Sequence, residues 1–288
     1  CSFFAVSTGT QNTHVRDNKW DRTRVIQSGR NGGYGAGNNV GIRAGLSDGS
    51  RPDYVYILNS DAFPKPDAIR VLYDHLNTTP STGFAGSFIE GEDEVQHTTT
   101  FRFPSIWSEF EGSIHFGPVS KLLKSYRVPV ELTKTTPVDW LAGASVMMRQ
   151  DVLDEIGLFD ETFFLYFEET DLCRRAQKAG HRVMFVAESV VTHLGSVSTG
   201  MKEWKRVPDY WFNSRWHYFT KNHGRAYAAC GTILHLLGGG LHLLRGKLTG
   251  KDNSRAPHFF RTLLRHDAAA LFQFQQQRPS QPAPQIGE

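Results

Sequence analysis

The sequence has little cysteine and no strong excess of charge of either sign. Its 288 residues include three cysteines, Cys1, Cys173 and Cys230, and no two of them form a CxxC pair. This scarcity excludes a disulfide framework and the usual structural zinc spacing, and it favours a reducing compartment. The 32 basic residues nearly balance the 29 acidic ones, for a formal net charge of +3. The charge therefore gives no indication of nucleic acid as a partner.

Long apolar runs are also missing. The start, CSFFAVSTGTQNTH, has no basic n-region and no long apolar core, so we expect no secretory signal there. The longest apolar region, residues 226–244, is interrupted by His235, three glycines and His242, and its flanks are basic. We predict a packed or membrane-surface helix in this region rather than a membrane span.

Strand and helix patterns alternate over residues 24–76. The strand-like RVIQS and YVYIL are each followed by a helix-like stretch, VGIRAGL after a glycine-rich segment and residues 67–76 after Pro66. With 39% apolar residues, the chain is long enough for a substantial core. The pattern predicts an α/β fold with a mostly parallel sheet and helices on both faces. In such sheets ligands bind outside the carboxyl ends of the strands.

The rest of the chain gives weaker signals. Residues 98–137 show little periodicity and predict a long loop at an active or acceptor site. From residue 138 regular elements return. We expect a strand with a small-residue turn over 138–149, a short helix capped by Asp151 and ending near Gly157, a helix from Glu168 to Gly180, and two short strands over 181–186 and 189–194. The Pro/Gln-rich tail after Gln275 is typical of disorder.

Asn59-Ser60-Asp61 follows the apolar strand YVYIL directly. A carboxylate at the carboxyl end of a strand suits Mg²⁺ or Mn²⁺, which takes oxygen ligands and bridges the phosphates of a diphosphate. An Asp in this place can equally cap the turn by accepting hydrogen bonds from its own loop. Taken alone, the residues favour neither role.

The glycine-rich segment NGGYGAGNNVG, residues 31–41, does not match a dinucleotide-binding fingerprint. Starting from Gly33 or Gly35, the third glycine of GxGxxG falls on Asn38 or Val40, which disfavours an NAD-dependent oxidoreductase. Two interpretations remain. The segment is either a turn whose backbone amides approach a polar ligand or an ordinary tight connection.

An acidic cluster follows the aromatic run FFLYF. Glu168, Glu169 and Asp171 lie where an apolar wall raises the pKa of a carboxyl group and makes it a usable base. The alternative is that the helix dipole favours these acidic residues in the first turn of a helix, with Asp171 paired to Arg174 or Arg175. We assign Asp171 to the structural role and at least one glutamate to the chemical one. His193, at the end of a predicted strand, is a candidate to complete a metal site with Asp61.

The motifs NGGYGAGNNVGI, YILNSDAFPKPDAI, VDWLAGASVMMRQDVLDEIGLFDETFFLYFEETDLCRRAQKAGHRV and VVTHLGSVS resemble those of bacterial glycosyltransferase family 2, rhamnosyltransferase-like members in particular. The resemblance covers about residues 24–223. It implies a GT-A fold, in which a Rossmann-like nucleotide half and an acceptor half share one sheet. It also implies inverting transfer of a sugar from a nucleotide-activated donor.

The resemblance also implies roles for individual residues. Asp61 matches the metal-binding carboxylate of a DXD-like element whose first Asp is replaced by Asn59, and Glu168-Glu169 matches the element that holds the base, with Glu169 preferred. His193 matches a late histidine associated with the metal or diphosphate. Donor-binding positions match Asn31, Gly33, Asn38, Asn59, Ser60 and Asp61; the sugar and acceptor wall matches Trp140, Gly143 and Ala144; and residues 210–215 resemble an aromatic-basic segment often near the membrane.

The expected function is transfer of a rhamnose-like sugar from a dTDP- or UDP-sugar, with Mg²⁺ or Mn²⁺, to a cell-surface glycan or lipid-linked acceptor. The expected place is the cytoplasm, with peripheral contact to the inner face of the cytoplasmic membrane. We expect a GT-A domain over residues 1–200, a helical extension over 201–275 and a tail over 276–288.

One departure from the family supports an alternative. CSFFAVSTGTQNT lies where the second strand of the family would be, without its matching Asp, and nothing in the sequence matches the strand and helix before it. If the chain is a fragment, these elements lie upstream. If it is complete, we expect impaired nucleotide binding. The departure motivates an alternative function, a catalytically impaired nucleotide-sugar-binding relic that binds without turnover.

Overall fold

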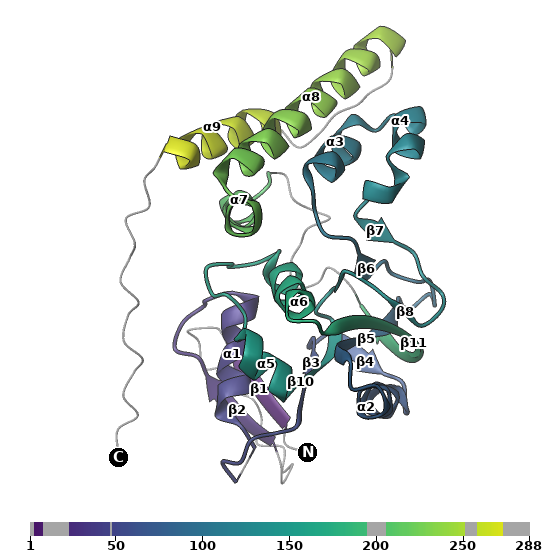
Figure 1. Cartoon of the computed structure of the whole chain (residues 1–288), viewed down its shortest axis with the longest axis vertical. Helices are drawn as coiled ribbons and strands as arrows, with labels where there is room; N and C mark the ends of the chain where they lie inside the picture. The colour runs from purple at the N-terminus through teal and green to yellow at the C-terminus, as the bar shows by residue number, and fades with distance from the viewer. Residues whose placement is uncertain (1–2, 8–22, 47, 195–205, 251–257, 273–288) are drawn as a thin grey trace.

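The computed structural model describes residues 3–7, 23–46, 48–194, 206–250 and 258–272 (Figure 1). Its strands are β1 (Phe3–Ser7), β2 (Thr23–Gln27), β3 (Tyr54–Leu58), β4 (Ala62–Pro64), β5 (Thr82–Glu90), β6 (Thr100–Phe101), β7 (Pro129–Val130), β8 (Thr136–Pro137), β9 (Trp140–Leu141), β10 (Ser145–Arg149) and β11 (Arg182–His193). Its helices are α1 (Tyr34–Ala44), α2 (Ala68–Thr78), α3 (Ile106–Ile114), α4 (Gly117–Leu122), α5 (Gln150–Ile156), α6 (Glu168–Lys178), α7 (Asp209–His223), α8 (Arg225–Thr249) and α9 (Phe259–Phe272), with a 3₁₀ turn, η1 (Lys124–Tyr126).

The central sheet has the strand order β3-β10-β5-β11-β4, with β8 added to β11. The prediction of a mixed α/β sheet is confirmed, but the expectation of mostly parallel pairs is wrong for the described residues. In this sheet only β5 and β11 pair in parallel. The reason is that β10 inserts between β3 and β5 and runs antiparallel to both. The two short strands predicted after residue 181 are one strand, β11, with an irregularity between Val186 and Val190.

Helices cover both faces of the central sheet, as predicted. Side chains alternate along β10, so Val146 and Met148 join a core with α5 and α6, whereas Met147 joins a second core with α2. On α2, Leu72 and Leu76 are fully buried against this second face. The alternation places the two helical layers on opposite sides of the strands whose ends carry the candidate site.

The N-terminal strands form a sheet of their own. β1 pairs in parallel with β2, and in the described part of the chain neither strand joins the central sheet. The family resemblance implies a single sheet, so this expectation is corrected. Among the described residues, β3 is the edge strand of the central sheet and pairs only with β10, so no described strand connects that edge to the sheet of β1 and β2.

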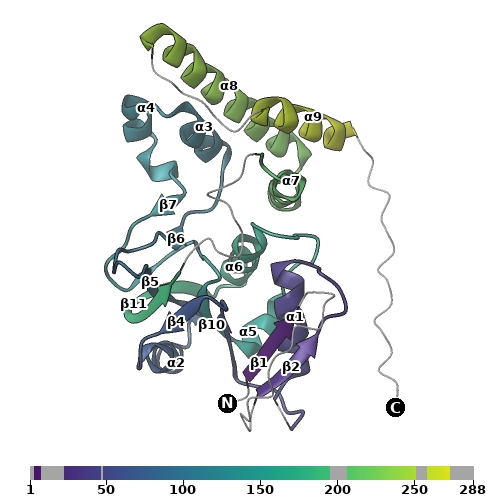
Figure 2. The same ribbon diagram turned by 180° about the vertical axis from the view of Figure 1, so that it is seen from behind.

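Residues 98–137 are more ordered than their sequence indicates, and the prediction of a long loop is wrong. They contain α3, α4 and β8, and they supply β6 and β7 to a small sheet ordered β7-β6-β9. Ser105 caps α3 through a reciprocal hydrogen-bond pair with Ser108. A distant part of the chain stabilises this region, because α3 packs along α8 and lies beneath it in Figures 1 and 2.

The C-terminal helices form a layer at one end of the molecule (Figure 2). α7 holds this layer to the body, since Lys221 forms ion pairs with Asp160 and Asp171 at 2.8 Å each. The predicted domain boundary at residue 200 and the tail over 276–288 lie outside the described residues. The division into domains stays a prediction.

Candidate active site

Asp61 and His193 meet at the edge of the central sheet. After β3 ends, the chain turns through Asn59-Ser60-Asp61 and enters β4, which pairs with the end of β11 so that His193 lies opposite Ala62. His193 Nε2 lies 3.1 Å from Asp61 Oδ1, and the two side chains are 16% and 12% exposed. The backbone N–H of Leu194 donates to the carbonyl of Asp61 at 3.1 Å. Strand pairing therefore brings together the two residues that the sequence proposes as metal ligands.

This pair fits a metal that is shared with a ligand. The described residues contain no group of three or more His, Cys, Asp and Glu side chains that could hold a metal ion. A carboxylate and an imidazole are both donors that Mn²⁺ accepts, whereas Mg²⁺ prefers oxygen. Because such ions use one or two protein ligands together with phosphates and water, Asp61 and His193 suit an ion that bridges to a diphosphate.

The turn of residues 142–144 connects the end of β3 to the acidic cluster. The N–H of Asn59 donates to the carbonyl of Ala144 at 3.0 Å, and the N–H of Gly143 donates to Glu169 Oε1 at 3.2 Å. Tyr34 Oη donates to the Gly143 carbonyl at 2.7 Å. A Cβ atom at Gly143 would lie 2.1 Å from Tyr34 Oη, so only glycine fits between these groups.

The two glutamates occupy different environments in the first turn of α6. Glu168 is 1% exposed, and no hydrogen-bond partner for its Oε2 lies among the described residues. Burial, followed by the negative charge of Glu169, raises the pKa of Glu168 well above its ordinary value. Burial also raises the pKa of Glu169, which keeps partial exposure beside Gly143. Burial and both glutamates raise the pKa of Tyr34, so its hydroxyl stays protonated as a donor.

Strained backbone positions these glutamates. Tyr166 and Phe167 both have φ of 70°, in the left-handed region that bulky residues rarely occupy. Two such residues in succession cost on the order of 1–3 kcal/mol each and persist only where surrounding contacts impose them. Ser214 of α7 supplies one such contact by donating to the Leu165 carbonyl at 3.0 Å. Strain of this kind is concentrated at functional sites.

The glycine-rich segment is mostly helical, since α1 already begins at Tyr34 rather than near Val40. Gly33 has φ of 88°, and a Cβ atom there would lie 1.7 Å from the Phe164 carbonyl oxygen. Asn31 Oδ1 accepts from the Gly33 N–H, and Asn38 Nδ2 donates to the Tyr34 carbonyl within the helix. Among the described residues, the side-chain hydrogen bonds of Asn31 and Asn38 therefore stay within their own segment. The N–H of Tyr34, which donates to the Phe164 carbonyl at 3.1 Å, joins α1 to the loop before the glutamates.

Sequence reasoning missed Asn39 and Tyr34. Asn39 is fully buried, and its side chain bonds both the N–H and the carbonyl of Phe159 at 3.0 and 2.9 Å. An Asn inside a helix is a weak signal for such a role, because Asn disfavours helix interiors unless its side chain is used. Tyr34 carried no signal, because its partner Gly143 lies 109 positions away.

Of the remaining predicted residues, Trp140 and Ala144 lie in or directly before the 142–144 turn, and Asp171 lies on α6. Trp140 stacks on Phe101 with ring centroids 4.1 Å apart, and its Nε1 donates to the Arg102 carbonyl. Ala144 is buried in a small core with Ala62. Asp171 is fully buried and pairs with Arg175 at 2.9 Å, so its predicted structural role agrees with its contacts.

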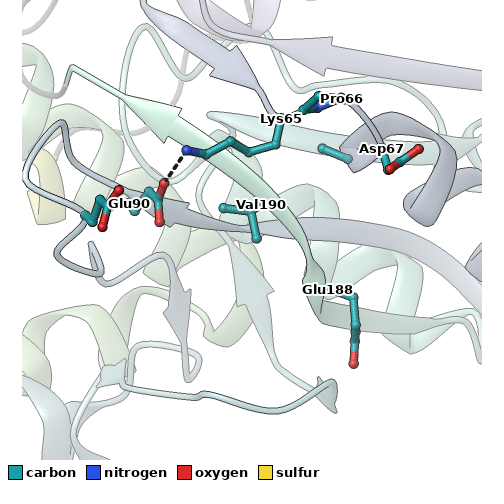
Figure 3. A pocket seen from close by; sticks show the side chains of 8 residues that line it. Lys65, Pro66, Asp67, Glu90, Glu188 and Val190 are labelled. Atoms are coloured by element: carbon teal, nitrogen blue, oxygen red, sulfur yellow. Dashed lines mark ion pairs between the residues drawn. The ribbon is translucent and has the colours of Figure 1, made fainter.

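A separate pocket of about 440 Å³ lies beside β4 and the start of α2 (Figure 3). It is lined by Lys65, Pro66, Asp67, Ala68, Glu90, Glu94, Glu188 and Val190. Lys65 Nζ is already paired with Glu90 Oε1 at 3.1 Å. Because the lining holds four carboxyl groups and one ammonium group, this pocket is a poor site for an anionic diphosphate.

Replacing Gly143 with alanine should disturb the site from within. The new methyl group would force Tyr34 or the 142–144 turn to move, which should lower the free energy of unfolding by about 1–3 kcal/mol. Gly112→Ala is the matched control, because nothing lies within 4 Å of a Cβ atom at Gly112. Urea denaturation of both variants checks the prediction. Equal stability of Gly143→Ala and the wild type would contradict the contact.

Comparisons with known proteins give the same class of protein. Residues 11–227 match the model of a family described as glycosyltransferase-like family 2. The chain is 30% identical over 195 residues to an N-acetylglucosaminyl-diphospho-decaprenol L-rhamnosyltransferase from Mycobacterium tuberculosis, covering 63% of this chain and 62% of that protein. It is 28% identical over 158 residues to the rhamnosyltransferase WbbL of Escherichia coli, covering 54% of this chain and 58% of that protein. The chain thus spans less than two thirds of the length of both relatives.

A solved structure, GalNAc-T7 with UDP, GalNAc and Mn²⁺, aligns over 92% of this chain and 48% of that chain, with a TM-score of 0.53 and 13% identity. The likeness shows a shared fold, so the architecture is the GT-A fold of glycosyltransferases. With three quarters of its residues inside the family match, the chain belongs to glycosyltransferase-like family 2. The fold and family implied by the sequence motifs are confirmed.

Proposed function

We propose that the protein is an inverting glycosyltransferase that moves a sugar from a nucleoside-diphosphate donor to a hydroxyl group of a glycan or lipid-linked acceptor. One observation carries the proposal. The turn of residues 142–144 accepts a hydrogen bond from Asn59 at the end of β3 and donates one to Glu169. The end of the strand that leads into the candidate donor-binding residues and the candidate base thereby meet at one turn.

In this mechanism Glu169 removes the proton of the acceptor hydroxyl. The oxygen then attacks the anomeric carbon from the face opposite the nucleotide, and the bond between that carbon and the diphosphate breaks with its electron pair on the diphosphate. Gly143 and Tyr34 hold Glu169 in place through the contacts described above. Asp61 and His193 would hold a divalent ion, Mg²⁺ or Mn²⁺, which when bound supplies Lewis-acid stabilisation of the leaving charge.

The names of the relatives support narrower choices. Two are rhamnosyltransferases, which favours rhamnose as the transferred sugar. A dTDP- or UDP-sugar as donor is the choice that the resemblance of the sequence motifs implies. The name of the mycobacterial relative specifies a lipid-diphosphate-linked acceptor, which favours an acceptor of that kind. The cytoplasmic face of a membrane is the place that the sequence motifs imply for it. We propose these identities for the present chain.

A donor panel tests the proposal. The full chain is incubated with dTDP-rhamnose and with UDP- and GDP-sugars, each with Mn²⁺ or Mg²⁺ and a polyprenyl-diphosphate-linked sugar as acceptor. The readout is released nucleoside diphosphate together with the mass of the glycosylated acceptor. Binding of a donor without turnover on any acceptor would replace the proposal with that of a nucleotide-sugar-binding relic.

Replacing Asp61 with alanine should weaken metal-dependent nucleotide binding. We expect a loss of more than about tenfold in affinity, since even partners that merely orient a metal ligand contribute about 10–100-fold. Calorimetry with a nucleoside diphosphate, with and without Mn²⁺, measures this effect independently of turnover. Asp67→Ala is the matched control, because the Asp67 side chain is 72% exposed and its partner at 3.2 Å, Arg70, is exposed as well. Unchanged Mn²⁺-dependent binding by Asp61→Ala would remove Asp61 from the role.

A further inference from the structure

The outer face of α8 is apolar, whereas its inner face is small and polar. Five large side chains on the outer face are between 50% and 79% exposed: Ile233, Leu237, Leu241, Leu244 and Leu248. The buried positions of the same helix are alanine, glycine and threonine. A surface helix of a water-soluble domain shows the opposite arrangement, with its large apolar residues facing the core.

The inner face of α8 is committed to its neighbours. A Cβ atom at Gly238 would lie 2.1 Å from Ser113 Oγ of α3, and one at Gly239 would lie 2.2 Å from the Phe260 ring of α9. His235 Nδ1 lies 2.8 Å from Glu109 Oε2. Rotating the helix to bury its leucines would break all of these contacts. The fold therefore holds the leucine face outward.

Neighbouring helices also carry exposed apolar side chains. α9 exposes Leu264 and Phe272, and α4 exposes Leu122. Figures 1 and 2 show α8 and α9 as the outermost layer at one end of the molecule, with α4 near one end of α8. A stripe of five exposed apolar side chains on one helix differs from the single exposed apolar residues found on ordinary surfaces, and it indicates an interaction site.

Charge decides which partner fits this patch. The two helices of this surface, α8 and α9, contain five Lys and Arg, and their one acidic residue, Asp267, is buried. Lys247, Arg261 and Arg265 are exposed on the same two helices. Two copies of this surface would repel each other, whereas anionic lipid headgroups attract it. The combination of an apolar stripe with basic flanks is typical of helices that lie in a membrane interface.

We infer that the outer face of α8, together with the exposed side chains of α9, docks on the surface of an anionic lipid bilayer with α8 parallel to the membrane plane. Among the described residues, α8 is the one helix that is both long enough and apolar enough to cross a membrane. The packing of α8 on α3 and α9 instead holds it along the surface of the protein. α3 packs on α8 and follows β6, and β6 pairs with β9, the strand that carries Trp140. The inference deepens the proposed function and rests on it in one respect, namely that the acceptor is held in a membrane.

Vesicle flotation tests the docking surface. The full chain is mixed with vesicles of phosphatidylglycerol and phosphatidylcholine, or of phosphatidylcholine alone. The double variant Leu237→Gln/Leu241→Gln should bind the anionic vesicles about 10–100-fold more weakly than the wild type, because it removes two exposed apolar side chains that docking on the bilayer would bury. The control Ile69→Gln/Val95→Gln changes two exposed apolar residues outside α8 and α9 and should bind as the wild type does.

A second variant tests the charge argument. Arg261→Gln/Arg265→Gln should weaken binding to the anionic vesicles by about fivefold for each charge removed, and binding to phosphatidylcholine alone should change little. Wild-type protein that does not float with anionic vesicles would overturn the inference, as would an α8 variant that floats equally well. A wild-type dimer that the α8 variant converts to a monomer would assign the stripe to a second copy instead. Flotation reads no sugar transfer, so its failure and the failure of the transferase proposal are distinguishable.

Discussion

Replacing Glu169 with glutamine should reduce the rate of sugar transfer by about 10²–10⁴-fold, the usual contribution of a general base. Glutamine keeps the shape of the side chain and can still contact the Gly143 N–H through its carbonyl oxygen, but it cannot take the acceptor proton. The binding of donor should change little. Released nucleoside diphosphate at saturating donor and acceptor measures the rate, and calorimetry measures the binding.

The pH dependence of transfer gives an independent readout. A base must be deprotonated to act, and burial raises the pKa of Glu169. The wild-type rate should therefore fall as the pH drops through a value above the ordinary glutamate range, and Glu169→Gln should lose this limb of the profile. Glu92→Gln is the control, because Glu92 is exposed. A larger loss of rate in Glu168→Gln than in Glu169→Gln would transfer the role of base to Glu168.

Replacing Arg215 with methionine should lower the free energy of unfolding by about 3–5 kcal/mol, because it leaves two buried carboxylates without their shared cation. Arg215 is 0% exposed and lies 3.0 Å from Glu109 Oε2 and 2.9 Å from Asp267 Oδ2. Thr232 also hydrogen-bonds Asp267. These contacts join α3, α7, α8 and α9, so the layer that carries the apolar stripe depends on them. Urea denaturation at neutral pH measures the loss.

The effect should depend on pH with a definite sign. Burial alone would raise the pKa of Glu109, but Arg215 and His235 outweigh burial and lower it to about 2. A carboxyl group with a depressed folded-state pKa stabilises the fold above its unfolded pKa and loses this contribution as the pH falls toward the folded value. The difference in the free energy of unfolding between the wild type and Arg215→Met should thus be largest at neutral pH. It should narrow as the pH falls from about 4.5 toward about 2.

Arg206→Met is the matched control for Arg215→Met. Arg206 is exposed and lies 3.9 Å from the exposed Asp209, and such surface pairs contribute about 0–1 kcal/mol. Equal losses in the two arginine variants would show that burial of the Arg215 cluster contributes nothing. An unchanged pH profile in Arg215→Met would contradict the assignment of the low pKa of Glu109 to that arginine.

Local signals predicted the elements with strong periodicity. The strand β3 and the helices α2, α5 and α6 lie within a few residues of their expected places, because their apolar spacing, Pro66 and Gly157 act over one or two helical turns. The pairing of Asp171 with Arg175 was accessible for the same reason, since residues four apart on a helix are neighbours. Signals of this range carry no information about which distant strand or helix becomes a partner.

Elements that depend on distant partners were predicted poorly. Residues 98–137 have little periodicity of their own, and α3 is held by the inner face of α8. The burial of Arg215 could not be anticipated, because Glu109 and Asp267 lie 106 and 52 positions from it. The direction of β10 is likewise a property of the sheet. An antiparallel strand between β3 and β5 looks, in sequence, like any other buried strand.

The sequence by itself determined which chemical groups are present and the local elements that carry them: an Asn-Ser-Asp turn after a buried strand, two glutamates at a helix start, and a histidine at the end of a strand. Only the tertiary structure decided which of them meet. The pairing of β4 with β11 brings Asp61 to His193 across 132 positions, and the 142–144 turn joins Asn59 to Glu169. Hydrogen bonds across such separations follow from strand pairing and close packing, which local spacing does not encode.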